Sequence, residues 1–363
     1  MSSSADYLSI ILNDIPLMDV RAPIEHIKGS INSATNLPLM TDSEREQVGT
    51  CYKQQGQDKA IELGRALVTE QKQQQRTEQW IEFCNNFPEG YLFCFRGGLR
   101  SRITQQWIQE SGVNYPYIEG GYKAMRRFLI DELELSVATL PMMLISGRTG
   151  CGKTRLLKQL PNTVDLEELA NHKGSSFGAT IKPQPSLINF ENALSSAFLK
   201  HRHQHKRTVF LEDEGRLIGS LTLPLSLKTK MTTLPHIELT TDIEQRIDFA
   251  IEDYVDALLA SFQLTMSEQQ AIEALTQRHR LSLTKIRKRL GTERYVEAQA
   301  LLENAISQQV NQNTTTGYRD FIHLLLTQYY DPMYDYQLSK KTRHCVFKGN
   351  HAQIIDYINH HNL

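Results

Sequence analysis

Two short loops of this chain hold residues whose types and spacing could do chemistry. In the first, a cysteine ends an apolar stretch and is followed by glycines and arginines, in the order Cys94-Phe95-Arg96-Gly97-Gly98-Leu99-Arg100-Ser101. The N–H groups of a glycine-rich turn and nearby guanidinium groups both favour the thiolate, which is the nucleophilic form of cysteine. The loop therefore predicts a nucleophilic cysteine in an anion pocket, with the site residues Cys94, Arg96, Gly97, Gly98 and Arg100.

The second loop has the spacing of a phosphate-binding loop. Gly147-Arg148-Thr149-Gly150-Cys151-Gly152-Lys153-Thr154 fits the pattern G-x-x-x-x-G-K-[ST], after an apolar strand at Met142–Ser146 and before a helix at Arg155–Leu160. Glycines let backbone N–H groups surround a phosphate, the lysine reaches its terminal oxygens, and the hydroxyl can hold Mg²⁺. The motif predicts a diphosphate-like or triphosphate-like ligand without specifying ATP, bound by Gly147, Gly150, Gly152, Lys153 and Thr154.

Acidic residues at the end of a later strand belong to the same prediction. Thr208–Leu211 is apolar and is followed by Glu212-Asp213-Glu214, where an acid that organises a metal belongs in phosphate-loop enzymes. Glu212 or Asp213 is expected to organise a metal or to act as a base, and the pattern does not separate these roles. No metal site is certain, and the need for Mg²⁺ stays open.

A run of basic residues lies in a helical region without an intervening acid. Such a patch contacts RNA phosphates without reading sequence, although a solvated helix face is the alternative. The His201–Arg207 run is a second, weaker candidate. The predicted tRNA-binding residues are Arg278, Arg280, Lys285, Arg287, Lys288 and Arg289.

Length and composition indicate two globular domains that position these loops. The chain has 363 residues with 40% hydrophobic residues, and its 40 Lys and Arg nearly balance 41 Asp and Glu to a net charge of −1. Five scattered cysteines without a C-x-x-C pair disfavour a disulfide framework or structural zinc site. No stretch approaches the roughly 20 apolar residues of a membrane helix, and the N-terminal residues lack a signal-peptide pattern. We therefore expect a cytoplasmic protein with no membrane partner.

The expected elements are of the α/β class. Leu17–Val20 and Tyr91–Phe95 are predicted strands, Leu63–Phe87 is a predicted helix, and residues 40–60 are left unassigned. The expected domains are residues 1–130 and 131–363, the second with a helical, tRNA-binding segment around residues 241–310.

The cysteine loop fits two known chemistries. Its spacing Cys94-x5-Arg100 matches the loop of cysteine phosphatases, whereas Asp19-Val20-Arg21, Glu25 and Gly29-Ser30-Ile31 resemble the entry motif of rhodanese domains. Residues 1–130 therefore resemble a rhodanese-like domain, and the P-loop NTPase-like α/β domain follows with a helical C-terminal part. The rhodanese loop is usually shorter, so Arg100 is a departure that implies a larger anion pocket.

Over nearly its whole length the chain resembles bacterial tRNA 2-selenouridine synthases. The resemblance depends on the two loops and on the ordered motifs Asp165-Leu166-Glu167, Lys173–Gly178, Gln184-Pro185-Ser186, Phe190-Glu191, Phe210–Gly219 and the Tyr329–Tyr336 cluster.

This resemblance implies a transferase that acts on tRNA carrying 2-thiouridine at the wobble position. The family attaches a geranyl group from geranyl diphosphate to the sulfur, and then replaces the S-geranyl group with selenium from selenophosphate. The resemblance makes Cys94 the selenium carrier, and implies a selenophosphate-supplying enzyme as partner. It implies co-substrates rather than a tightly bound cofactor. Our own assignment gives the diphosphate to the phosphate loop and selenophosphate to the cysteine loop.

Three other functions remain open at this point. An ATP-dependent tRNA sulfurtransferase would consume ATP without a prenyl donor. A cysteine phosphatase-like enzyme would hydrolyse aryl phosphates and ignore tRNA. A non-catalytic P-loop switch with a degenerate first domain would keep its activity without Cys94.

Overall fold

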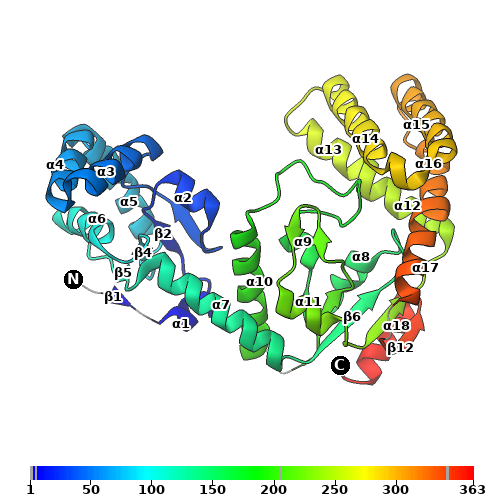
Figure 1. The fold of residues 1–363 in the computed structure, drawn as a ribbon, viewed down its shortest axis with the longest axis horizontal. Coiled ribbons are helices and arrows are strands. Elements are labelled where there is room, and N and C mark those ends of the chain that lie inside the picture. Colours follow the sequence, from blue (N-terminus) through cyan, green and yellow to red (C-terminus); the bar gives the residue numbers. More distant parts are fainter. Residues whose placement is uncertain (1–2, 5, 205–206, 341–342) are drawn as a thin grey trace. The chain divides into compact units, whose positions relative to one another are not determined.

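The computed structural model describes residues 3–4, 6–204, 207–340 and 343–363, and it forms two compact units (Figure 1). The first unit comprises Met1–Ala138 and Ser186–His203, and the second comprises Thr139–Pro185 and Gln204–Leu363. This division differs from the single boundary after residue 130 that we expected. Helix α7 (Gly121–Thr139) continues through residue 130, and helix α10 (Leu187–Gln204) packs on the first unit, where Ser195 donates a hydrogen bond to the Leu129 carbonyl.

The first unit is built on a five-stranded sheet in which all strands are parallel, in the order β1-β5-β4-β2-β3. Successive side chains along each strand belong to apolar clusters on opposite faces of the sheet. Leu17 and Phe93 lie in one cluster, and Met18 and Leu92 lie in the other. Helices cover both faces, which is the arrangement that parallel sheets require. The strands are β1 (Ser3–Ser4), β2 (Leu17–Asp19), β3 (Ala34–Asn36), β4 (Tyr91–Phe93) and β5 (Tyr117–Ile118).

The helices of this unit correct one prediction. The expected single helix at Leu63–Phe87 is two helices, because Val68 and Thr69 leave the helical conformation and a new helix begins at Glu70. The unassigned residues 40–60 contain a helix that starts at Asp42, with Thr41 as its N-cap in a capping box with Glu44, a signal present in the sequence. Besides α7 and α10, the described helices of this unit are α1 (Tyr7–Leu12), α2 (Pro23–Lys28), α3 (Asp42–Gln55), α4 (Gln57–Leu67), α5 (Glu70–Asn86) and α6 (Leu99–Glu110).

The second unit contains another five-stranded parallel sheet, in the order β12-β11-β6-β8-β7. Its central strand β6 (Met142–Ser146) has the predicted bounds and is buried throughout, and β8 (Val209–Glu212) lies within one residue of its prediction. The other strands are β7 (Thr163–Val164), β11 (His236–Leu239), β12 (Cys345–Gly349) and the antiparallel pair β9 (Leu217–Ile218) and β10 (Leu221–Thr222). Four helices accompany them: α8 (Lys153–Leu157), α9 (Leu166–Leu169), α11 (Leu225–Met231) and α18 (His351–His360).

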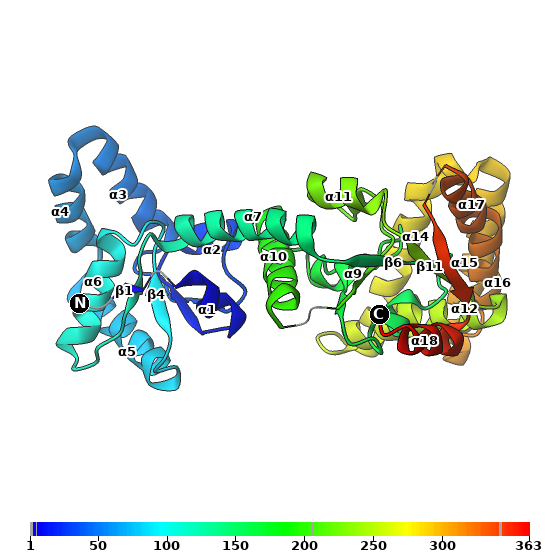
Figure 2. The same cartoon turned by 90° about the horizontal axis from the view of Figure 1, so that it is seen from below.

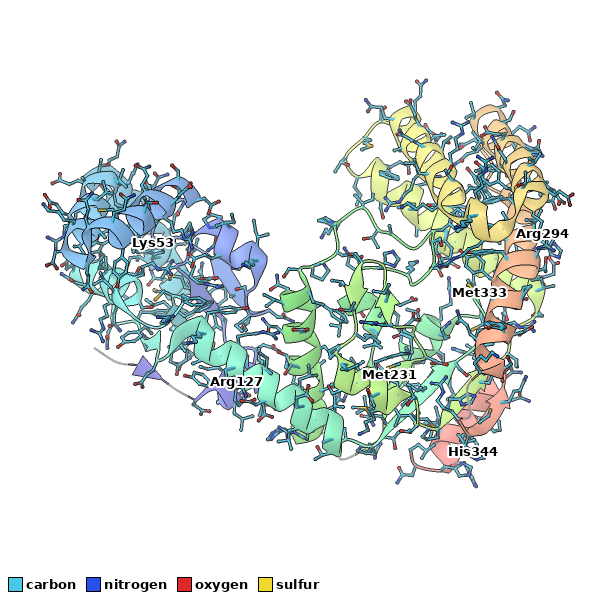
Figure 3. The ribbon with its side chains drawn as sticks, in the orientation of Figure 1. Lys53, Arg127, Met231, Arg294, Met333 and His344 are labelled. Carbon is cyan, nitrogen blue, oxygen red and sulfur yellow. The ribbon has the colours of Figure 1, made fainter. Side chains whose placement is uncertain are left out.

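Helices dominate the second unit from residue 243 to residue 339, which confirms the predicted helical C-terminal part (Figures 1 and 2). Helices α14, α15 and α16 pack in succession around one apolar cluster, and Met333 of α17 lies against it (Figure 3). Two segments, η1 (Glu252–Asp256) and η2 (Leu326–Tyr330), are π-helical insertions within this run. The α-helices are α12 (Ile243–Ile251), α13 (Ala257–Gln263), α14 (Glu268–Leu290), α15 (Thr292–Gln312), α16 (Tyr318–Leu325) and α17 (Asp331–Ser339).

In the described part of the chain, no helix has both the length and the hydropathy that crossing a bilayer would require.

Candidate functional site

The cysteine loop lies at the carboxyl end of β4, in the middle of the first sheet. Cys94 is 3% exposed, and its carbonyl accepts a hydrogen bond from the N–H of Tyr122 at 2.9 Å. Gly97 has φ +63°, and a side chain there would meet the Ile118 carbonyl oxygen at 2.8 Å. Within the described chain, the N–H groups of residues 95 to 98 donate to no backbone carbonyl. The loop therefore has the unpaired N–H groups that an anion-binding nest needs.

A second glycine pair, which the sequence analysis missed, closes against this loop. Gly121 begins α7 with φ +58°, and a Cβ atom there would lie 2.4 Å from the Cys94 carbonyl oxygen and 2.5 Å from the Gly97 nitrogen. Gly120 also has a positive φ of +71°. The Gly-Gly sequence before a helix was the available signal, since only glycine allows such close backbone contact.

The two arginines of the loop have different surroundings. Arg96 is exposed, and its guanidinium lies 5.8 Å from the Phe95 ring centre. Arg100 is held by Glu25, whose two carboxylate oxygens accept hydrogen bonds of 2.6 and 3.2 Å from its guanidinium. Burial lowers the pKa of Arg100, but Glu25 and the neighbouring Cys94 and Asp19 raise it further, so its net shift is upward. Arg100 therefore keeps its charge beside Cys94, although both of its Nη atoms already donate hydrogen bonds to Glu25.

The Asp19-Val20-Arg21 motif forms a buried ion pair beneath the loop. Both Oδ atoms of Asp19 accept hydrogen bonds from the Arg21 guanidinium, at 2.9 and 2.6 Å, and His26 Nδ1 lies 2.9 Å from Oδ2. Burial alone would raise the pKa of Asp19, but the hydrogen bonds from His26 and Arg21 lower it overall. Arg21 also lies over the Tyr122 ring, 4.0 Å from its centre. The motif thus supports the strand and α7 rather than the reacting atoms.

The phosphate loop has the backbone shape that its glycines predict. Gly147, Gly150 and Gly152 all have positive φ values, of +153°, +76° and +87°. Lys153 starts α8 and its Nζ donates to the Gly147 carbonyl at 3.2 Å, while Thr154 follows on the same helix. The five predicted phosphate-binding residues therefore lie together in the loop after β6 and the first turn of α8.

Acidic residues surround Lys153. Burial lowers the pKa of its ammonium group, yet the net shift is upward because Cys151, Glu214, Glu167 and Glu212 favour the charged form. Burial and the Glu214 charge raise the pKa of Glu167 to about 8. Burial and neighbouring acids also raise the pKa of Glu212 well above its ordinary value. Such mutually repelling carboxyl groups could hold a divalent cation, and Glu167 and Glu214 were not among the predicted residues.

The structure separates the two acids that the sequence left equivalent. Glu212 is fully buried; its Oε2 accepts a hydrogen bond from the Leu166 N–H at 2.7 Å, and its Oε1 has no hydrogen-bond partner among the described residues. Asp213 is instead bound to Arg343, whose Nη1 donates to its Oδ1 at 2.9 Å, and both side chains are 3% exposed. This ion pair commits Asp213 to structure, so Glu212 is the better placed of the two for a metal or proton role.

A further arginine, without a sequence signal, fixes the outer side of the phosphate loop. Arg246 of α12 is 4% exposed and donates to the Thr149 carbonyl through Nε at 3.0 Å and Nη2 at 2.9 Å. It also forms an ion pair with Asp331 of α17, with Nη2 2.6 Å from Oδ1. The helical part thereby holds the loop in its observed conformation.

The predicted RNA-binding residues all lie on α14 but differ in availability. Arg280 is paired with Glu303 of α15 at 2.7 Å, and Arg278 donates to the Thr180 carbonyl at 2.7 Å. Arg287 lies over the Tyr295 ring, 5.1 Å from its centre. Among the described residues no acidic partner accompanies Lys285, Lys288 and Arg289, which are exposed. Of the second candidate run, Arg202 pairs with Glu132, whereas His205 and Lys206 lie outside the described residues.

Comparison with known proteins covers almost the whole chain. The sequence model described as "tRNA 2-selenouridine synthase AAA domain" matches residues 140–363. The tRNA 2-selenouridine synthase of Marinobacter nauticus is 52% identical over 97% of this chain and 96% of that protein. The enzyme of the same name from Shewanella denitrificans is 50% identical over 97% of this chain and 96% of its own. That from Alcanivorax borkumensis is 45% identical over 98% of both.

Proposed function

Since this chain belongs to the tRNA 2-selenouridine synthase family, and is thus an enzyme acting on tRNA, we propose that it works through an S-geranyl intermediate. In this proposal 2-thiouridine at the wobble position receives a geranyl group from geranyl diphosphate. Selenium from selenophosphate then replaces the S-geranyl group. A selenophosphate-supplying enzyme would be the partner, and the cytoplasm, where tRNA is modified, the location.

The observation that carries the proposal is the pairing of two anion sites of different chemistry in one chain. One site has a cysteine followed by N–H groups that donate to no backbone carbonyl among the described residues, and the other has the glycines and lysine of a phosphate loop. An enzyme that only transfers phosphoryl groups would need the phosphate loop alone, and a cysteine phosphatase would need the cysteine loop alone. A two-step exchange that uses a diphosphate ester and a selenophosphate needs both.

We assign the first step to the phosphate loop. The thiocarbonyl sulfur attacks C1 of geranyl diphosphate, the S–C1 bond forms, and the C1–O bond breaks with its electron pair on the departing diphosphate. N3 of the uracil ring gives up its proton to solvent, so the alkylated base is neutral. N–H groups of the loop and Lys153 would stabilise the negative charge that develops on that leaving group. The acids around Lys153, with Glu212 and Glu167 among them, are where Mg²⁺ would bind if the step uses it.

We assign the second step to the cysteine loop. Sulfur bound only to the ring carbon is a poor leaving group, whereas the alkylated sulfur can leave as geranyl thiol. The selenium atom of selenophosphate attacks C2 of the uracil ring, the C2–Se bond forms, and the C2–S bond breaks with its electrons on sulfur, which takes a proton. Water then attacks phosphorus, the P–Se bond breaks with its electron pair on selenium, and phosphate leaves while N3 of the ring takes a proton. Cys94 is the residue that we propose holds the selenium donor for this attack, and Arg96 would bind its phosphate group while the charge of Arg100 favours the anion.

The first domain is, in this proposal, a rhodanese-like domain. Its support is a parallel sheet that ends in the Cys94 loop, together with the Asp19–Arg21 ion pair in the position of the family's entry motif.

The proposal is tested by mass spectrometry of nucleosides from 2-thiouridine tRNA after incubation with the protein and both donors. Geranyl diphosphate alone should give S-geranyl-2-thiouridine, and selenophosphate added afterwards should give 2-selenouridine. Consumption of ATP with no prenylated nucleoside would instead favour the ATP-dependent sulfurtransferase.

A further inference from the structure

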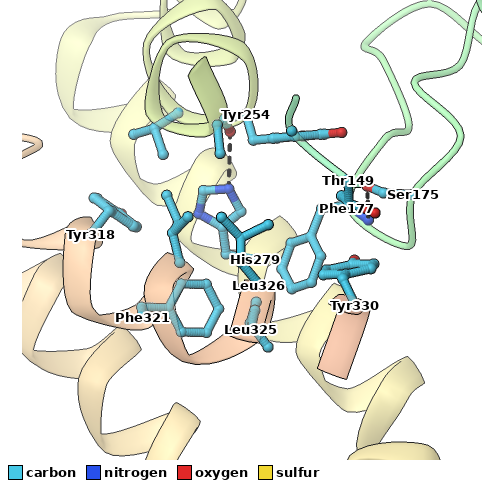
Figure 4. Close-up of a pocket in the computed structure, with 14 residues that line it drawn as sticks. Thr149, Ser175, Phe177, Tyr254, His279, Tyr318, Phe321, Leu325, Leu326 and Tyr330 are labelled. Atoms are coloured by element: carbon cyan, nitrogen blue, oxygen red, sulfur yellow. Dashed lines mark hydrogen bonds between the residues drawn. The ribbon is translucent and has the colours of Figure 1, made fainter. Parts of the chain in front are cut away.

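An apolar cavity lies within the second unit against the phosphate loop (Figure 4). Its volume is about 40 Å³, and two of its lining residues, Thr149 and Gly150, belong to the loop itself. Most of the others are aliphatic or aromatic residues of the helical part. They include Ala250, Val255, Phe321, Ile322, Leu325 and Leu326.

The polar groups of this cavity are uncharged. Some of them have partners inside the protein, whereas His279 Nδ1 and the Tyr330 hydroxyl are buried without a hydrogen-bond partner among the described residues. His279 is 3% exposed, and its Nε2 lies 3.1 Å from the Tyr254 carbonyl oxygen (Figure 4). Burial lowers the pKa of His279 to about 4, so its ring is neutral at pH 7. The Tyr318 hydroxyl donates to Gln309 at 2.7 Å. The cavity therefore offers an uncharged, mainly hydrocarbon surface to whatever enters it.

Two segments of the protein lie between the cavity and the phosphate site: the phosphate loop and residues 174–177. The segment after α9 places Gly174 against the acidic group, where an added Cβ would lie 2.2 Å from Glu167 Oε1. The next residue, Ser175, lines the cavity together with Phe177. Thus the phosphate loop and the 174–177 segment each contact an ionic site on one side and an apolar site on the other.

A ligand that uses both sites must have an anionic head joined directly to a hydrocarbon chain. Nucleoside triphosphates do not fit this description, because a polar ribose follows their phosphates. We propose that the cavity binds the hydrocarbon chain of a prenyl diphosphate whose diphosphate lies in the phosphate loop, and that the cavity selects the chain length. This inference rests on the proposed function, since it names the place where the prenyl donor of that reaction binds.

The cavity must widen for a ten-carbon chain to enter. A volume of about 40 Å³ admits only a few waters. The segments that would move are identifiable, because Tyr254 and Val255 lie on η1, and Leu326 and Tyr330 lie on η2. π-Helical insertions interrupt the regular hydrogen-bond ladder and occur often at functional sites. Both insertions of this helical run thus line the same cavity.

Binding of unreactive donors tests this inference without any need for turnover. Calorimetry would compare inorganic diphosphate with the thiolo analogues of dimethylallyl, geranyl and farnesyl diphosphate. Since each buried methylene strengthens binding by about fourfold, the geranyl analogue should bind at least ~10-fold more tightly than the dimethylallyl analogue. Equal affinity of these two analogues would overturn the inference.

Two substitutions test whether the hydrocarbon chain of the ligand lies in the cavity. Ala250→Leu adds volume to the cavity wall and should remove the preference for the geranyl analogue while the affinity for inorganic diphosphate stays unchanged. Leu325→Ala enlarges the cavity and should shift the preference toward the farnesyl analogue. Leu302→Ala is the matched control, because Leu302 is fully buried in the same apolar cluster but does not line the cavity. Retained diphosphate affinity shows in each case that the variant is folded.

The outcomes separate this inference from the proposed function. Geranylated tRNA from wild type and Ala250→Leu with equal KM values for geranyl diphosphate would refute the cavity assignment and leave the proposed function standing. Chain-dependent binding that Ala250→Leu abolishes, without any geranylated nucleoside, would refute the proposed function and support the cavity as a prenyl site.

Discussion

Arg246 and Asp331 form a buried ion pair whose arginine also donates two hydrogen bonds to the Thr149 carbonyl of the phosphate loop. The pair joins α12 and α17 through two residues that are 85 positions apart in the sequence, and Arg246 also contacts the backbone of the loop. The helical part therefore does not only enclose a core. It also sets the conformation of the loop that we assign to the diphosphate.

Breaking this pair should destabilise the second unit and weaken phosphate binding. Asp331→Asn leaves the Arg246 charge buried without its counter-ion, a change that costs about 3–5 kcal/mol. Urea unfolding followed by circular dichroism measures the loss. Glu303→Gln removes the partner of Arg280 in an exposed pair and should cost under ~1 kcal/mol. Equal losses for the two variants would show that the Arg246–Asp331 pair has no special role.

The acids around Lys153 predict that the unliganded protein loses stability as the pH rises. Glu167 has a folded pKa of about 8, above its ordinary value of 4.5, so the folded state binds more protons than the unfolded state between these values. The stabilisation is complete below the unfolded pKa and is lost as the pH rises through the folded one, at about 1 kcal/mol per pH unit. Below pH 6.5 the buried His279, whose pKa is lowered to about 4, changes stability in the opposite direction, so thermal unfolding from pH 7 to pH 8 measures this slope.

Glu167→Gln removes the titrating group and should flatten that pH dependence. Glu268→Gln, at an exposed position in the first turn of α14, serves as the control and should keep the wild-type slope. A wild-type protein that gains stability from pH 7 to pH 8 would contradict the upward pKa shift of Glu167.

Close backbone packing at Cys94 predicts a difference between two neighbouring glycines. Gly121→Ala places a Cβ atom 2.4 Å from the Cys94 carbonyl oxygen at φ +58°, so it should destabilise the first unit by about 1–3 kcal/mol and reduce selenium transfer. Gly98→Ala meets no atom within 4 Å and should leave stability unchanged. Denaturant unfolding of both variants is the measurement, and a stable Gly121→Ala variant would refute the described loop packing.

Exposed cations of α14 should bind tRNA through its phosphates. Lys288→Gln is expected to weaken tRNA binding and to lower the slope of log affinity against log salt concentration by about 1. Lys59→Gln is the control, since Lys59 is an exposed cation paired with Glu62 in the first unit. Filter binding across a salt series provides the slopes. Identical slopes for wild type and Lys288→Gln would exclude a phosphate contact at this residue.

The sequence was most informative where chemistry requires particular residues in a short window. The phosphate loop and β6 were predicted residue by residue, because the glycines, Lys153 and the apolar strand all lie within 13 consecutive residues. The pairing of Asp213 with Arg343 could not be predicted, because the two residues are 130 positions apart and nothing local marks their contact. The same holds for Arg246, and for the return of α10 to the first unit. Such contacts depend on tertiary packing, which a single sequence does not encode in any short motif.

The most direct test of the central claim assigns each reaction step to one loop. Nucleosides would be quantified by mass spectrometry after wild type, Cys94→Ser and Lys153→Met act on 2-thiouridine tRNA with geranyl diphosphate and selenophosphate. Cys94→Ser should accumulate S-geranyl-2-thiouridine and form no 2-selenouridine. Lys153→Met should fail on 2-thiouridine tRNA yet convert tRNA that already carries the S-geranyl group. Full selenouridine formation by Cys94→Ser, or loss of both steps in Lys153→Met with its fold intact, would contradict the division of labour between the two loops.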